Sequence, residues 1–184
     1  MVEVWVPYGD TEVCLTISQE NLLGILEAKA PTPAGNPVEE IGRALDNPIN
    51  THNLAQMVKP ESTVAIALDS SIEAEYSSAI VSQLCRILQE AGVQPSNITV
   101  LVGSRPDGNP ASEDVTVSVP EGVQLIVHNP YQKDELSEVG VTSHRTRVLL
   151  NKNFTQAGFR ILTGKIGLHA YAGYSGGRQV ILAV

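Results

Sequence analysis

Alternating apolar and polar positions predict two strands at the start of the chain. Val2–Val6 and Thr11–Ile17 alternate in this way, and Pro7–Asp10 between them has the composition of a tight turn. We therefore expect an N-terminal β-hairpin. The following Pro31–Gly35 segment is too rich in Pro and Gly for regular structure, which indicates a linker.

A helix is predicted directly after this linker. Asn36 is a favourable N-cap residue, and Pro37 fits the first helical turn. Glu39 and Glu40 suit the positive end of the helix dipole. The helical pattern ends near Asn47-Pro48, where proline stops the helix.

The middle of the chain has the pattern of a βαβ unit. Thr63–Leu68 is a short apolar run typical of a central parallel strand, and Ile98–Val102 is the next such run. Between them, Ile72–Ala91 carries apolar residues at helical spacing and ends at Gly92. Aromatic residues make up only 4% of the chain, so the core must be mainly aliphatic. These features predict a three-layer α/β fold, with a mostly parallel sheet, flanking helices and the N-terminal hairpin.

Later segments add strands and one polar loop to this fold. Val123–Val127 and Phe159–Leu162 are predicted strands, and Val139–Leu150 is a predicted hairpin with Ser143–Arg145 near its tip. Gly103–Asp114 is a polar loop that follows a strand. Because open α/β sheets bind ligands at the carboxyl ends of their strands, this loop is a candidate ligand contact.

Composition excludes several classes of partner. A net charge of −8 argues against nucleic acid, since phosphate binding needs a basic stripe. We find neither an apolar run of membrane-spanning length nor a signal-peptide pattern, so we expect a cytoplasmic protein without membrane contact. Cys14 and Cys85 lack C-x-x-C spacing, which leaves a single disulfide or two free thiols. Because a domain of this size does not need a disulfide, we expect reduced core thiols.

The candidate chemistry concentrates in Thr163–Gln179, a strand end followed by a glycine-rich loop that leads into a helix start at Val180–Leu182. Glycines here allow the backbone to approach an anion, and Ser175 adds a hydroxyl. A small-molecule site and a plain tight connection both explain the pattern. His169 within this loop is either a structural histidine or a proton carrier.

Asp69 follows the predicted strand Thr63–Leu68, which makes it a candidate site residue. It is equally suited to cap the helix that comes next. The remaining histidines have simpler interpretations: His52 as a helix-entry residue, His128 after a strand and His144 in a turn. No pair of histidines has compact zinc spacing, so no metal site is predicted.

The residues His169–Gly177, which read H-A-Y-A-G-Y-S-G-G, closely resemble the signature of the nickel-pincer lactate racemase family. Further landmarks of this family occur in the right order along the whole chain: Pro7–Gly9, Glu20–Leu23, Arg43–Ile49, Val58–Pro60, Ile98–Leu101, Asn151-Lys152 and Ile161–Gly164.

The resemblance implies racemisation or epimerisation of 2-hydroxy acids. In this family a nickel ion is held by a pincer derived from nicotinic acid mononucleotide, which is tethered to a lysine. The cofactor takes hydride from the substrate's α-carbon and returns it to either face, and two histidines exchange the hydroxyl proton. By resemblance, His169 is one of these catalytic histidines. The resemblance also implies a set of cofactor-binding residues: Asp69, Tyr174, Ser175, Gly176, Gly177 and Gln179.

Three chemical positions depart from the family pattern. Position 179, where the tethering lysine should stand, is Gln179, which has no nucleophilic amine. The family's G-T-H-R-P motif, with its second histidine, is replaced by Gly103–Pro106. The family arginine that grips the substrate carboxylate is Ile72. We therefore expect no covalently bound nickel-pincer cofactor, and no catalysis by this chain alone.

Residues 1–184 are interpreted as the N-terminal domain of such a protein, without the C-terminal domain; the chain is either a piece of a longer protein or naturally short. Three functions remain open: an enzyme domain acting on a 2-hydroxy acid, a non-catalytic module that binds a small carboxylate or a nucleotide, and a structural domain. In each case we expect the site where Asp69, the Gly103–Pro106 loop and the Gly167–Gly177 loop converge.

Overall fold

The computed structural model describes residues 1–24, 32, 34–103 and 117–184. The chain divides into two units, Met1–Ala34 and Gly35–Val184. Each is described by itself.

The first unit contains the predicted hairpin. Strand β1 (Val2–Tyr8) pairs antiparallel with β2 (Thr11–Ile17), in a register that runs from Val2 opposite Ile17 to Tyr8 opposite Thr11. The turn is shorter than predicted, because Pro7 and Tyr8 belong to the strand. Gly9 accommodates the tight turn with a φ of +60°. A 3-10 turn, η1 (Gln19–Asn21), follows.

Cys14 lies on β2 and is exposed, so its assignment as a core thiol was wrong. A two-stranded hairpin has no second layer of its own to cover its side chains. Cys85 is buried as expected, and burial raises the pKa of its thiol to about 11.

In the described part of the second unit, a parallel four-stranded sheet has the order β5 (Gln124–Val127), β4 (Ile98–Val102), β3 (Val64–Leu68) and β8 (Phe159–Leu162). The fold class predicted from the sequence is confirmed. All five residues of β3 are buried, as expected for a central strand.

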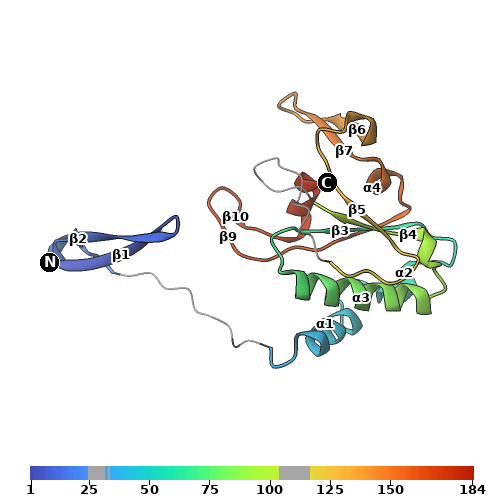
Figure 1. Ribbon diagram of the computed structural model, residues 1–184, viewed down its shortest axis with the longest axis horizontal. Coiled ribbons are helices and arrows are strands. Elements are labelled where there is room, and N and C mark those ends of the chain that lie inside the picture. Colours follow the sequence, from blue (N-terminus) through green and yellow to red (C-terminus); the bar gives the residue numbers. More distant parts are fainter. Residues whose placement is uncertain (25–31, 33, 104–116) are drawn as a thin grey trace. The chain divides into compact units, whose positions relative to one another are not determined.

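The two faces of β3 contribute to different clusters of core side chains. Val64, Ile66 and Leu68 belong to a cluster with the buried residues of α3 (Ala74–Glu90), whereas Ala65 and Ala67 belong to one with α4 (Lys152–Gln156) and η4 (Gly177–Ala183). Figure 1 shows α3 along one face of the sheet, with α4 on the other. The small alanine side chains leave room for the short helical turns on that second face.

Helix α1 (Pro37–Asp46) begins as predicted, because the side chain of Asn36 accepts hydrogen bonds from the N–H groups of Val38 and Glu39. Helix α2 (Leu54–Met57) follows His52 closely. Helix α3 begins two residues later than the predicted Ile72 and ends one residue earlier than Ala91. Its N-cap is Glu73, so the interpretation of Asp69 as the cap of this helix was wrong.

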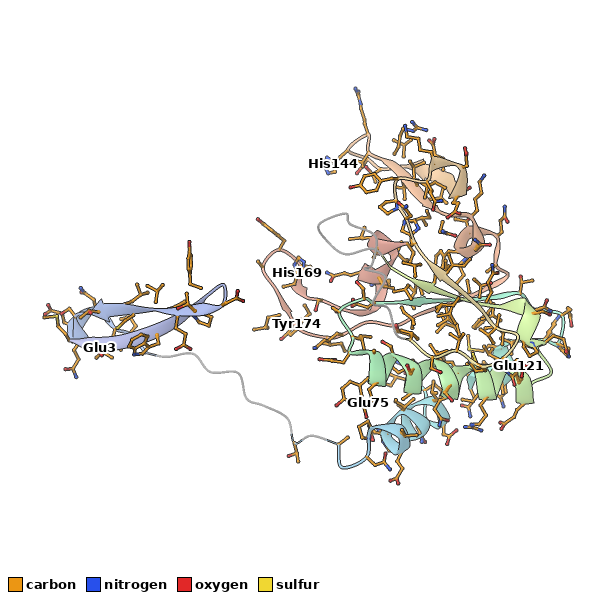
Figure 2. All side chains as sticks on the ribbon, in the orientation of Figure 1. Glu3, Glu75, Glu121, His144, His169 and Tyr174 are labelled. Carbon is orange, nitrogen blue, oxygen red and sulfur yellow. The ribbon has the colours of Figure 1, made fainter. Side chains whose placement is uncertain are left out.

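The rest of the unit consists of short elements. Strands β6 (Leu136–Val141) and β7 (Arg147–Asn151) form the predicted hairpin with His144 in its turn (Figure 2), and β9 (Leu168–His169) pairs with β10 (Gly173–Tyr174). The 3-10 turns η2 (Pro95–Asn97) and η3 (Lys133–Glu135) connect elements. The helix start predicted at Val180–Leu182 is part of the 3-10 turn η4. Within the described residues, no helix has the length and apolar character needed to cross a membrane.

Candidate functional site

The residues that follow three of the four parallel strands, β4, β5 and β8, donate backbone hydrogen bonds to a neighbouring strand at one edge of the sheet. The Gly103 N–H donates to the Leu68 carbonyl, the His128 N–H to the Val102 carbonyl and the Thr163 N–H to the Ala67 carbonyl, at 2.9, 2.9 and 3.0 Å. This carboxyl edge is where the sequence predicts the site. Ser104–Pro106, the rest of one predicted site loop, lie outside the described residues, as do Asp107–Asp114.

Asp69 connects the end of β3 to the glycine-rich segment. Its Oδ1 accepts a hydrogen bond from the Ser71 N–H at 2.9 Å, and its Oδ2 accepts one from the Lys165 N–H at 3.3 Å. The first bond forms a turn that holds residues 69–71 out of α3. Asp69 and the start of the segment Thr163–Gln179 therefore meet, and both oxygens of Asp69 already have backbone partners.

Ser175 closes the base of the β9–β10 hairpin. Its Oγ accepts a hydrogen bond from the Gly167 N–H at 2.9 Å and donates one to the Lys165 carbonyl at 3.0 Å. The Ser175 N–H also donates to the Gly167 carbonyl at 2.9 Å. The hydroxyl that the sequence offered as a ligand contact is thus engaged within the segment itself.

Two glycines allow close backbone packing between the start of this segment, at residues 164 and 165, and residues 176 and 177. A Cβ on Gly164 would lie 2.6 Å from the nitrogen of Gly177. Gly176 has a φ of +93°, and a Cβ there would lie 2.9 Å from the Lys165 carbonyl oxygen. At these positions the glycines serve tight chain packing, the simpler of the two explanations that the sequence left open.

His169 lies exposed at the end of β9, next to the turn of residues 170–172 (Figure 2). Its Nδ1 accepts hydrogen bonds from the N–H groups of Tyr171 and Ala172, at 3.2 and 3.1 Å. The Tyr171 ring is tilted against the imidazole, with 6.3 Å between ring centroids. Tyr174 on β10 is also exposed. The imidazole therefore stabilises its own turn and remains accessible.

Position 179 does not fit a covalent tether. Gln179 is half-buried, and its Nε2 donates a hydrogen bond to the Tyr174 carbonyl at 3.2 Å. The lysine of the same segment, Lys165, binds Glu73 Oε1 through its Nζ at 2.9 Å, which lowers the pKa of Glu73. Arg178 stays charged and is no nucleophile. The residues present thus do not match a cofactor attached through a lysine at position 179.

A buried histidine, His128, also lies at this edge. Its hydrogen-bond partner was not predicted from the sequence. His128 and Asn151 are 4% and 0% exposed, and His128 Nδ1 lies 3.3 Å from Asn151 Nδ2. Burial lowers the pKa of His128, while the charge of Glu135 acts in the opposite direction. The two residues are 23 positions apart on different elements, so no local spacing signals the pair.

No group of three or more His, Cys, Asp or Glu side chains among the described residues is arranged to hold a metal ion. A hollow of about 310 Å³ lies at the opposite, amino-terminal edge of the sheet, away from these residues. It is lined by Thr63, Val64, Ser96, Asn97, Thr99, Asn153, Gln156 and Ala157.

Comparison with known proteins agrees with this architecture. Residues 8–183 match the model of the lactate racemase N-terminal domain family. Lactate racemases of Thermoanaerobacterium thermosaccharolyticum and Lactiplantibacillus plantarum are each 24% identical over 188 residues, covering 99% of this chain and 44% of the relative. The chain thus spans less than half the length of these relatives. The structure of the lactate racemase apoprotein from the former organism superposes with a TM-score of 0.75 at 22% identity, covering 99% of this chain and 43% of that chain.

Proposed function

Since the chain belongs to the lactate racemase N-terminal domain family, we propose that it supplies the carboxyl-edge site of a protein related to the 2-hydroxy acid racemases and epimerases. We further propose that this site holds no covalent nickel-pincer cofactor and that the chain alone does not catalyse racemisation. The observation that carries the proposal is the Gln179 amide, which hydrogen-bonds the Tyr174 carbonyl where the family's lysine should stand.

A second departure supports the same conclusion. Ile72, at the position of the arginine that should grip a substrate carboxylate, is half-buried in the turn before α3 and offers no charge. An anionic substrate would therefore lack the bidentate clamp that an arginine provides, and its reacting carbon would be poorly oriented. Loss of a second proton-transferring histidine would remove a further factor of about 10²–10⁴ in rate.

The test is to produce the full chain together with the enzymes that build the pincer nucleotide, in medium containing nickel. We expect the intact mass to equal that of the unmodified chain, nickel to be substoichiometric, and no interconversion of L- and D-lactate. A mass increase equal to the pincer adduct, with one nickel per chain, would contradict the proposal.

Gln179→Lys is the matched variant for this test. It restores the amine but not the arginine or the second histidine, so it should gain at most the adduct mass and remain unable to racemise lactate. Racemisation by this single variant would show that the other two positions are not needed.

A binding module for a small carboxylate or a nucleotide is the alternative function. It is favoured by the way the polar groups are used: Asp69 and Ser175 hold the glycine-rich segment, whereas His169 remains exposed. The ligand would be a small anion in either case. A cytoplasmic location stays a prediction from the sequence.

A further inference from the structure

The hydrogen bonds of His169 determine which of its ring nitrogens carries the proton. Backbone N–H groups can only donate, and two of them, from Tyr171 and Ala172, point at Nδ1. Nδ1 must therefore offer its lone pair. In the neutral imidazole the single proton then resides on Nε2, because one ring nitrogen is a donor whenever the other is an acceptor.

This tautomer is inconsistent with a proton acceptor at Nε2. A neutral imidazole that takes a proton from a substrate hydroxyl must present an unprotonated nitrogen to it. Here Nδ1 is already occupied by the turn, and Nε2 carries hydrogen. What His169 offers to a ligand is an N–H donor.

We propose that His169 binds an oxyanion of a small carboxylate or phosphate ligand through its Nε2–H, as a hydrogen-bond donor and not as a base. The inference rests on the proposed function, in which this site binds an anion without catalysing racemisation. It assigns the resemblance-derived catalytic histidine a different role in this chain.

The surroundings of the ring favour such a ligand. His169 is exposed, and in the described part of the chain its Nε2 has no hydrogen-bond partner and no carboxylate forms an ion pair with the ring. Arg178 of the same segment is exposed and, among the described residues, has no ion-pair partner. An exposed N–H donor and an unpaired cation of the same segment are each suited to a carboxylate or phosphate oxygen.

The loop that presents this donor is held from both ends. His169 pairs with Gly173 across the β9–β10 hairpin, and Ser175 closes the hairpin base through Gly167 and Lys165. The ring is thus bonded to the turn it precedes, and the turn is fixed to the sheet edge through Asp69. Less ordering is then required when a ligand binds.

The first experiment reads the tautomer directly. Long-range ¹H–¹⁵N correlation spectra of the ¹⁵N-labelled chain separate protonated from unprotonated ring nitrogens, and single variants of the four histidines assign the signals. For neutral His169 we expect a protonated Nε2 and an unprotonated Nδ1. The opposite assignment would overturn the inference, whatever the cofactor content or racemase activity of the protein.

The second experiment uses two variants, each of which keeps one of the two functions of the ring. His169→Asn keeps a side-chain acceptor able to cap the turn but has no donor at the Nε2 position, whereas His169→Gln places an amide N–H there. L-lactate and inorganic phosphate serve as separate probes, which distinguishes a carboxylate site from a phosphate site. Binding is followed through chemical shifts of the glycine-rich segment.

We expect at least one anion to bind the wild-type chain, His169→Asn to weaken it about 10–100-fold, and His169→Gln to retain it within a few-fold. Neither anion shifting the segment at about 50 mM would overturn the anion-binding role. Equal binding by His169→Asn and wild type would overturn the donor role of His169. Racemisation by the chain would refute the proposed function separately, since neither measurement depends on turnover.

Discussion

His128 and His169 lie in two regions of the molecule that differ in burial. Both rings use Nδ1 for their hydrogen bonds, but one ring is buried and the other is exposed. Each ring contacts a hydrogen-bonding partner through Nδ1: the side-chain amide of Asn151 for His128, and the backbone N–H groups of residues 171 and 172 for His169. His128 is only 4% exposed, whereas His169 is exposed. The partner of His128 comes from a distant strand, and those of His169 come from its own turn.

The difference separates a histidine that holds the fold from one that is free to meet a ligand. Asn151 Oδ1 accepts hydrogen bonds from the N–H and the side-chain amide of Asn153, so Nδ2 is the group that faces His128. The amide thus donates to Nδ1, and His128 is also an Nε2–H tautomer. Its bond links the end of β5 to the start of α4 in the buried interior. Removing it should destabilise the domain, while changes around His169 should act locally.

The largest effect is expected from Asn151→Ala. The substitution removes the cap of α4 and leaves Nδ1 of a buried histidine without its donor, which together should lower the free energy of unfolding by about 2–4 kcal/mol. Urea unfolding followed by circular dichroism measures this. Asn153→Ala is the control, since its exposed amide makes one peripheral bond. Equal losses in the two variants would contradict a structural role for the His128–Asn151 pair.

A smaller and local effect is expected from Ser175→Ala. Loss of the two Oγ bonds should cost about 1 kcal/mol at the base of the β9–β10 hairpin. The amide of Gly167 should then exchange with solvent about fivefold faster in hydrogen-exchange NMR. Ser175→Thr retains the hydroxyl and should restore protection. Unchanged exchange in Ser175→Ala would show that the hydroxyl does not hold the segment.

The free energy of unfolding should depend on pH through the buried ring of His128. Burial lowers the pKa of His128 below its ordinary value near 6.5. Below that pH the unfolded chain takes up a proton that the native ring resists, so the free energy of unfolding should fall until the lowered native pKa is reached. Urea midpoints between pH 7.5 and about 5 measure the slope.

The matched variant for this titration is Asn151→Asp. Its carboxylate keeps an oxygen for the α4 cap but favours a charged imidazolium, so it should flatten the contribution of His128 to the slope. A urea midpoint that falls more steeply with decreasing pH in Asn151→Asp than in the wild type would contradict the assigned hydrogen-bond direction.

The smallest effect is expected from Glu73→Gln. Its ion pair with Lys165 lies on the surface, and such pairs are weakened by water and salt. We expect no resolved change in the urea midpoint. A clear loss would mean that this pair, and not Asp69 and Ser175, anchors the glycine-rich segment.

Much of the fold follows from local patterns that tertiary context reinforced. The predicted strands Thr63–Leu68 and Ile98–Val102 are largely apolar because both faces of a parallel sheet are covered. They correspond to β3, which begins one residue later at Val64, and to β4. Asn36 caps α1 through its own side chain, within reach along the chain. The predicted start of α3 was wrong. Asp69 accepts hydrogen bonds from the N–H groups of Ser71 and Lys165, and the helical spacing of apolar residues does not predict these contacts.

Of the candidate site, the sequence determined the residue types and their order. It placed Asp69 and the segment Thr163–Gln179 at strand ends, and the family resemblance put Gln179 at the position expected for the tethering lysine. Only the tertiary structure decided how those groups are used. Asp69 and Ser175 bond the backbone of the segment, His128 lies beside Asn151, and Nδ1 of His169 accepts the N–H groups of residues 171 and 172. These outcomes depend on hydrogen bonds whose partners are chosen by distance and direction in three dimensions, and residue spacing alone does not specify them.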